Sequence, residues 1–167
     1  MAERTLVIMR HGKAEQSATK RDADRALEER GHRDAHAGGL WLAQQGIHPD
    51  LVLVSPALRT RITWHEVAVA FADAGAPVTP AVTYEAGLYD GGISGALDIL
   101  RAVRPEAKTV LLIGHNPTVS ALSQRLDDVR ARPAGGLRTS GIAVHAVDAD
   151  WAQLAAAPLT DEHTPRA

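Results

Sequence analysis

Two arginines and two histidines of this sequence stand at or just beyond the ends of apolar runs. Arg10 and His11 follow Leu6–Met9 directly, Arg59 comes shortly after a second run, and His115 shortly after a third. A guanidinium is permanently charged, and its planar fork of N–H donors matches phosphate oxygens. A neutral imidazole is a competent nucleophile that forms covalent intermediates. Four such groups around one phosphate would make a site for phosphoryl chemistry that requires no metal.

Each of these residues taken alone has a plainer interpretation. A histidine after a strand is more often a hydrogen-bonded structural residue, and Arg59 could be a solvated residue in the first turn of a helix. The run 114–117 (Gly-His-Asn-Pro) could be an ordinary turn before a helix. The functional interpretation therefore depends on whether the fold brings the strand ends together.

The apolar segments predict strands that alternate with helices. The expected strands are 5–9, 51–54, 81–83, 109–113, 141–147 and 151–157, and the expected helices are 31–45, 57–74, 97–103 and 118–126. Between them, 13–30 is expected to be a long loop with a helical turn, and 87–95 a mobile glycine-rich loop. This order is typical of a mainly parallel sheet covered on both faces, a three-layer α/β/α sandwich. The crevice of such a sheet lies at the carboxyl ends of its strands, where the four candidate residues fall.

The composition narrows the class of protein. The 167 residues suit one domain spanning 1–167, with 160–167 expected to be a frayed tail. A formal net charge of -2 argues against a broad nucleic-acid-binding surface, and the absence of cysteine excludes disulfides and thiolate nucleophiles. No segment approaches the ~20 apolar residues of a membrane helix, and no signal-peptide pattern is present. We therefore expect a cytoplasmic protein without nucleic-acid or membrane partners.

Four short motifs occur in a fixed order along the chain. They are Arg10-His11-Gly12 after an apolar strand, then 27–31 (Leu-Glu-Glu-Arg-Gly), 55–59 (Ser-Pro-Ala-Leu-Arg) and 114–117 (Gly-His-Asn-Pro). In combination they resemble the histidine phosphatase superfamily, also called the phosphoglycerate mutase-like family. The length of the chain and the last motif resemble its small bacterial branch, the phosphohistidine phosphatases.

The resemblance implies a role for each matched residue. His11 would be the nucleophile that takes the phosphoryl group as a phosphohistidine, which water then hydrolyses. Arg10, Arg59 and His115 would bind the phosphate oxygens, and a protonated His115 would help to neutralise the transition state. Further positions are expected to line the substrate-binding part of the site, namely Gly12, Lys13 and Asn116. For Lys13 the sequence alone favours the plainer interpretation, an exposed loop lysine.

The general acid is left open by the sequence. In the wider family a carboxylic acid protonates the leaving group, and Glu85 is the best-placed candidate because it follows a short strand. A solvated loop glutamate is the alternative. The chain also departs from the family pattern at Ala26, Thr60 and Trp64, which are supporting positions. Ser55 is expected to orient its loop or to cap the following helix.

Other sequence signals carry less weight. His32 and His36 share a helix face as metal ligands can, but no third ligand is near, so a solvated face is favoured. The glycine-rich stretch lacks the pattern of a phosphate-binding P-loop, and no serine-hydrolase elbow is present.

The sequence thus predicts a phosphatase without metal or other cofactor. Its substrate is expected to be a phosphorylated protein, carrying phosphohistidine, or a small phosphorylated metabolite. A phosphomutase and a non-catalytic phosphate-binding module are the alternatives. Intact His11 favours an enzyme, because a binding module has no need of a nucleophile.

Overall fold

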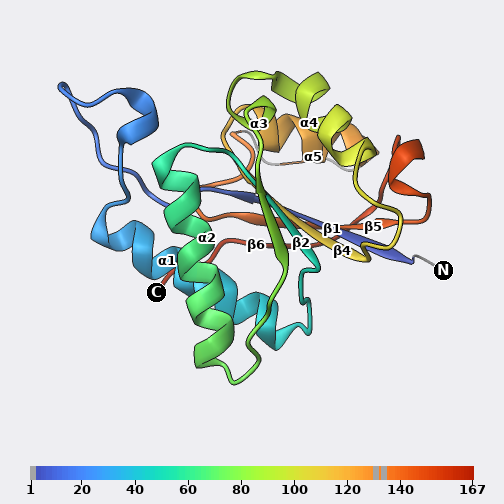
Figure 1. The fold of residues 1–167 in the computed structure, drawn as a ribbon, viewed down its shortest axis with the longest axis horizontal. Coiled ribbons are helices and arrows are strands. Elements are labelled where there is room, and N and C mark those ends of the chain that lie inside the picture. Colours follow the sequence, from blue (N-terminus) through green and yellow to red (C-terminus); the bar gives the residue numbers. More distant parts are fainter. Residues whose placement is uncertain (1–2, 130–131, 133–134) are drawn as a thin grey trace.

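A six-stranded sheet forms the centre of the computed structural model, which describes residues 3–129, 132 and 135–167. The strands lie in the order β3-β2-β4-β1-β5-β6, with the first four parallel and the last two antiparallel to their neighbours. Their bounds are Arg4–Arg10 (β1), Leu51–Val54 (β2), Ala81–Tyr84 (β3), Thr109–Gly114 (β4), Ile142–Val147 (β5) and Leu159–His163 (β6). The predicted α/β sandwich with a mainly parallel sheet is confirmed (Figure 1).

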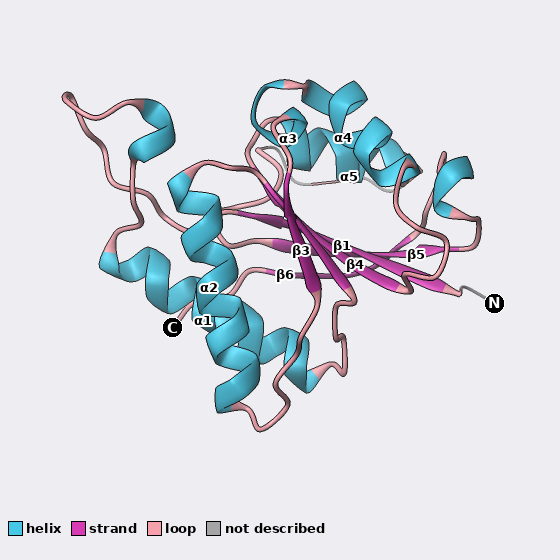
Figure 2. Ribbon diagram, viewed as in Figure 1, coloured by secondary structure: helices cyan, strands magenta, loops and turns pink. Residues whose placement is uncertain are grey.

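Helices cover both faces of this sheet (Figure 2). The α-helices are α1 (Glu29–Gln44), α2 (Leu58–Asp73), α3 (Gly87–Asp90), α4 (Gly92–Arg101) and α5 (Thr118–Leu126), and two short 3-10 helices are η1 (Asp22–Asp24) and η2 (Trp151–Gln153). One face packs on α1 and α2, and the other on α4 and α5. None of the helices in the described part of the chain has the length and apolar character to cross a membrane.

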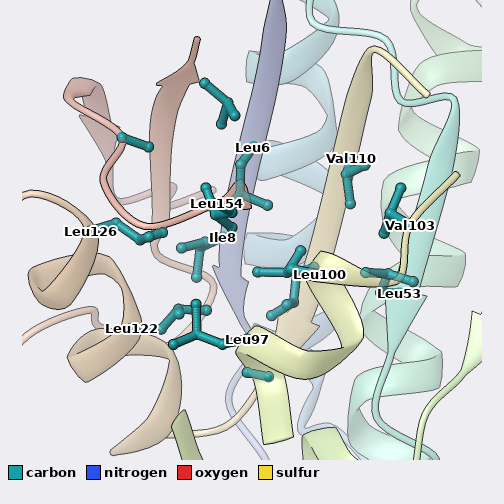
Figure 3. Close-up of a cluster of buried hydrophobic side chains, with 14 of the residues drawn as sticks. Leu6, Ile8, Leu53, Leu97, Leu100, Val103, Val110, Leu122, Leu126 and Leu154 are labelled. Carbon is teal, nitrogen blue, oxygen red and sulfur yellow. The ribbon is translucent and has the colours of Figure 1, made fainter. Parts of the chain in front are cut away.

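The central strand β1 shows why the sheet needs cover on both faces. Leu6 and Ile8 pack with α4 and α5 in one apolar cluster (Figure 3), and Val7 and Met9 pack with α1 and α2 in the other. All four side chains are at most 1% exposed. A strand buried on both faces must be apolar without alternation, and such a strand holds the group that follows it in a rigid place.

The C-terminal part of the chain differs from the sequence prediction. The strand expected at 151–157 is wrong, because the buried Trp151 sits in η2 and its Nε1 donates to the Ala107 carbonyl at 2.8 Å. The strand lies instead at Leu159–His163, and all of it except Leu159 falls in the segment predicted to be a frayed tail. That prediction is also wrong, since β6 pairs with β5 and Ala167 donates its backbone N–H to buried Asp34. β6 is polar because most of its residues are exposed, so its pattern gave no apolar signal.

The glycine-rich stretch 87–95 is mostly helical rather than a loop. It contains α3 and the first turn of α4. A Cβ added at Gly91 would lie 2.6 Å from the carbonyl oxygen of Gly87, and one at Gly95 3.0 Å from the same oxygen. The glycines therefore serve close backbone packing between two short helices, which outweighs their poor helix propensity.

Candidate active site

The ends of β1, β2 and β4 bring three polar residues side by side. Arg10 at the end of β1 is paired with Gly114 at the end of β4, and β2 pairs with β4 on the other side. The backbone N–H of His11 donates to the Gly114 carbonyl at 3.1 Å, and that of Ser55 donates to the Ile113 carbonyl at 3.2 Å. His11, Ser55 and His115 thus follow three adjacent strands, and the two imidazole centroids are 5.3 Å apart.

The His11 ring is held in one tautomer by the backbone. Its Nδ1 lies 2.7 Å from the carbonyl oxygen of Gly12, which can only accept, so Nδ1 carries the hydrogen and Nε2 keeps its lone pair. The residue is 8% exposed. Burial lowers the pKa of His11 to about 3, against a smaller raising effect of the Gly12 carbonyl. At neutral pH the ring is therefore an uncharged nucleophile with Nε2 available.

Gly12 is fixed tightly behind this ring. Its backbone N–H donates to Thr63 Oγ1 at 3.0 Å, and Thr63 is itself fully buried in α2. A Cβ at Gly12 would lie 2.8 Å from the Gly31 carbonyl oxygen and 3.2 Å from Ser140 Oγ. The close approach of two backbone segments is why the position takes glycine.

His115 is also uncharged in the empty site. Burial and then the charge of Arg59 lower the pKa of His115 to about 4. Its Nε2 lies 2.7 Å from Ser55 Oγ, while its buried Nδ1 has no partner among the described residues. The neutral ring differs from the protonated His115 that the resemblance implies, and a bound phosphate dianion is the group that would favour protonation. Ser55 therefore orients His115, and it does not supply the side-chain cap of α2.

Arg10 and Arg59 reach the same place from β1 and from the first turn of α2. Arg10 donates from Nη1 to the Leu137 carbonyl at 3.2 Å, and burial lowers its pKa. Arg59 is 5% exposed, and both of its Nη atoms bind Asp22. The Nε atoms of both arginines are buried without a partner in the described part of the chain. Buried donors of this kind are normally satisfied, so these two arginines keep hydrogen-bonding capacity for a ligand with acceptor oxygens.

A cavity of about 240 Å³ joins these groups. The described residues that line it are Arg10, His11, Lys13, Ala14, Gln16, Arg25, Arg59, His115, Asn116 and Thr139. They include four cationic side chains and no carboxylate. A larger cavity of about 820 Å³ lies beyond Asn116, which lines both, but its described lining contains neither His11 nor His115. The smaller cavity is therefore the one suited to a compact oxyanion such as a phosphoryl group.

Most of the predicted site residues meet at this cavity, but Gly12 and Glu85 are not among the described residues that line it. Lys13 and Asn116 line it, and Asn116 is fixed by its Nδ2, which donates to the Leu137 carbonyl at 2.8 Å. Glu85 instead lines a separate cavity with Leu51 and Asp98. The structure does not bring Glu85 to the histidines, and its role as general acid stays a prediction without geometric support.

Several residues of the site were missed from the sequence. Arg25 lines the cavity, Thr63 holds Gly12, and Asp22 and Tyr89 form a hydrogen-bonded group with Arg59. Only Arg25 had a usable signal, because it stands two residues before the family motif at 27–31. The others come from a 3-10 helix and from helix interiors, where no local pattern marks them.

Two further sequence interpretations concern surfaces away from the cavity. His32 and His36 are partly exposed, as expected of a solvated face, and they also pair with Glu66 at 2.5 Å and with Asp73 at 2.8 Å across α1 and α2. Across the described residues, no group of three or more His, Cys, Asp or Glu side chains is arranged to hold a metal ion.

Comparison with known proteins defines the class. The model of the histidine phosphatase superfamily (branch 1) matches residues 6–81. The uncharacterized protein Rv1276c of Mycobacterium tuberculosis is 33% identical over 167 residues, which cover 95% of this chain and 100% of the relative. The chain belongs to the histidine phosphatase superfamily, and the family predicted from its motifs is confirmed.

Solved structures place it within that family. A candidate phosphohistidine phosphatase SixA from Nakamurella multipartita is 35% identical, with a TM-score of 0.80 over 98% of this chain and 97% of that one. The protein histidine phosphatase SixA complexed with tungstate is 28% identical, with a TM-score of 0.80 over 96% and 97%. Mycobacterial glucosyl-3-phosphoglycerate phosphatase, at 18% identity and a TM-score of 0.66 over 98% and 100%, shares the fold. The chain thus matches the small phosphohistidine phosphatase branch, and its phosphatase class is supported.

Proposed function

We propose that this protein is a metal-independent phosphatase that works through a phosphohistidine intermediate on His11. The observation that carries the proposal is the tautomer and the neutral charge of the His11 imidazole. The Gly12 carbonyl fixes the hydrogen on Nδ1, burial keeps the ring neutral, and Nε2 belongs to a residue that lines a cavity with four cationic side chains. Such a ring is prepared for attack on an electrophilic phosphorus.

The reaction has two transfers. In the first, His11 Nε2 attacks phosphorus while the bond to the leaving nitrogen or oxygen breaks, and the leaving atom keeps the electron pair and takes a proton from solvent. In the second, water attacks the phosphohistidine, the P–Nε2 bond breaks, and the water proton is lost to solvent. Arg10, Arg59 and Arg25 would hold the equatorial oxygens in both steps, because guanidiniums match the charge that spreads over them.

The leaving group favoured by this site is a nitrogen. The described lining of the cavity contains no Asp or Glu that could protonate a departing alkoxide. The nitrogen of a phosphoramidate is basic enough to be protonated from solvent, so it needs little help from an enzyme acid. The similar solved structures are described as phosphohistidine phosphatases. We therefore propose phosphohistidine on a partner protein as the preferred substrate, and a small phosphate ester as the second candidate.

The test compares wild type with His11→Ala on an aryl phosphate and on a phosphohistidine peptide. We expect wild type to hydrolyse both, with the higher kcat/KM on the peptide, and the variant to hydrolyse neither. Vanadate should inhibit and EDTA should have no effect. Equal rates in the two proteins would exclude His11 as the nucleophile. Loss of activity in EDTA would exclude the metal-independent mechanism.

A further inference from the structure

Asp22 joins two of the arginines that line the cavity. It lies in η1, within the arm formed by 13–28 that projects from the body in Figure 1. Its Oδ1 accepts from Arg25 Nη2 at 2.9 Å and Nε at 3.2 Å. Its Oδ2 accepts from Arg59 Nη2 at 2.9 Å and from the Tyr89 hydroxyl at 2.6 Å, and its backbone carbonyl accepts from Arg59 Nη1 at 2.7 Å. One residue thus connects the arm, α2 and α3.

A carboxylate beside a phosphate site could either compete with phosphate for the arginines or anchor them. The donor count favours anchoring. A guanidinium has five N–H groups. Arg59 donates two of them to Asp22. Three therefore remain, including the N–H of the buried Nε, which has no described partner. Arg25 donates two N–H groups to Asp22 and one to the Glu15 carbonyl, so two N–H groups remain for a ligand. Phosphate can therefore bind without displacing Asp22.

The charges also allow both anions to be present. Arg10, Lys13, Arg25 and Arg59 contribute four positive charges around the cavity, and Asp22 offsets one, so the three that remain exceed the two negative charges of a phosphate dianion. The Tyr89 hydroxyl, followed by Arg59, holds the pKa of Asp22 well below its usual range, so the carboxylate is ionised at neutral pH. An arginine that is fixed before substrate arrives loses less side-chain entropy on binding, and preorganised donors are those that stabilise a transition state.

We propose that Asp22 is a positioning residue, which holds Arg59 and Arg25 ready for the phosphoryl group, and that Tyr89 acts through it. The inference rests on the proposed function, since it assigns how the phosphate donors of that site are prepared. Asp22 itself contacts arginines and Tyr89 and takes no part in bond breaking.

The first test is Asp22→Asn with Asp24→Asn as the matched control. Asp24 lies in the same 3-10 helix, but its described side-chain partner is the exposed Arg21 at 3.0 Å. We expect Asp22→Asn to raise the Kd of inorganic phosphate about tenfold by calorimetry, the size expected from re-ordering an arginine on binding. We expect kcat/KM on an aryl phosphate to fall at least as much. Asp24→Asn should stay within about twofold of wild type in both.

Two results would overturn the inference. Tighter phosphate binding by Asp22→Asn would make Asp22 a competitor rather than an anchor. A loss of activity with an unchanged phosphate Kd and a lowered Tm would make its role purely structural. Because phosphate binding is measured apart from turnover, wild type that binds phosphate without hydrolysing any substrate would refute the proposed function and still test Asp22.

The second test places Tyr89 in the same unit. Tyr89→Phe should raise the phosphate Kd about threefold in the wild-type background, because it removes one hydrogen bond to Asp22. In the Asp22→Asn background it should have no further effect, since coupled residues are not additive. If the effects of the two substitutions on the free energy of phosphate binding were fully additive in this double-mutant cycle, Tyr89 would act on the site independently of Asp22.

Discussion

Two buried histidines of this protein, His11 and His145, share a backbone hydrogen bond at Nδ1 and a lowered pKa, but only His11 lines the phosphate-sized cavity. The Nδ1 of His11 lies 2.7 Å from the Gly12 carbonyl, and that of His145 lies 2.9 Å from the Ala157 carbonyl. Burial lowers the pKa of both rings, so both are neutral at pH 7. Each also has arginine charge nearby. By tautomer and by charge, the two rings could serve equally well as nucleophiles.

The difference lies at Nε2 and in the position along the strand. His145 stands inside β5 with 0% exposure, and its Nε2 is 2.7 Å from Ser123 Oγ, which also accepts from Arg132. His11 stands one residue beyond β1, and in the described part of the chain its Nε2 has no hydrogen-bond partner. A lowered pKa and a neighbouring arginine are therefore not enough to make a site. The free nitrogen must also reach a cavity, and the strand end supplies that.

The largest expected effect comes from exchanging each histidine for asparagine. His11→Asn should lower kcat on an aryl phosphate by about a thousandfold or more, because it removes the covalent nucleophile. His145→Asn should leave kcat within about twofold at temperatures where the protein is folded. It should cost about 1–3 kcal/mol of stability, since it leaves Ser123 Oγ or the Ala157 carbonyl unpaired in the core.

Steady-state kinetics and thermal unfolding of the same two preparations check this crossover. A His145→Asn protein that is stable but inactive would contradict the assignment of His145 as structural and His11 as catalytic. So would a His11→Asn protein that keeps its activity.

The arginines beside the two rings give the next effect. Arg59→Lys should lower kcat/KM about a hundredfold, because lysine cannot present a planar fork to phosphate oxygens. Arg132→Lys, the matched change beside His145 and Ser123, should leave kcat/KM unchanged within about twofold. The phosphate Kd of each variant, measured by calorimetry, separates lost binding from lost transition-state stabilisation. Equal losses in the two variants would show that the effect is not specific to the cavity.

In stability the two histidines should behave alike. The pKa of His11 falls from about 6.5 in the unfolded chain to about 3 in the fold, and that of His145 is also lowered by burial. Between these pH values the unfolded chain binds protons that the folded chain does not, so the free energy of unfolding falls as pH is lowered below about 6.5. We expect a lower Tm at pH 5 than at pH 7.

Replacement of either histidine by asparagine should make that decrease in Tm smaller, whatever it does to activity. Thermal unfolding at the two pH values in one ionic strength measures it. A decrease in Tm that is unchanged in both variants would contradict the assignment of neutral rings to the folded state.

The parts of this site that could be predicted from the sequence are those that depend on strand ends. Arg10, His11 and His115 follow apolar strands whose order fixes a common edge, so pattern and topology were enough to bring them together. Asp22 and Tyr89 belong to the site only through contacts between the arm and the short helix α3. Local hydrophobic periodicity carries no information about such long-range contacts. β6 escaped prediction because an exposed edge strand carries polar residues, and α3 because its glycines serve close packing.

The smallest expected effect tests Glu85, the predicted general acid, which the structure does not bring to this cavity. If a carboxylic acid protonates the leaving group, Glu85→Gln should lower kcat for an ester with a poor leaving group far more than for a good one. Glu85 lines a cavity with Leu51 and Asp98 and not the one with His11. We therefore expect changes below about twofold on alkyl phosphate, aryl phosphate and phosphohistidine peptide alike. A selective loss on the alkyl ester would return Glu85 to the role of acid and would require it to move to the histidines. Uniformly small effects would leave the leaving group to solvent, and a site that works in that way is suited to cleaving a P–N bond.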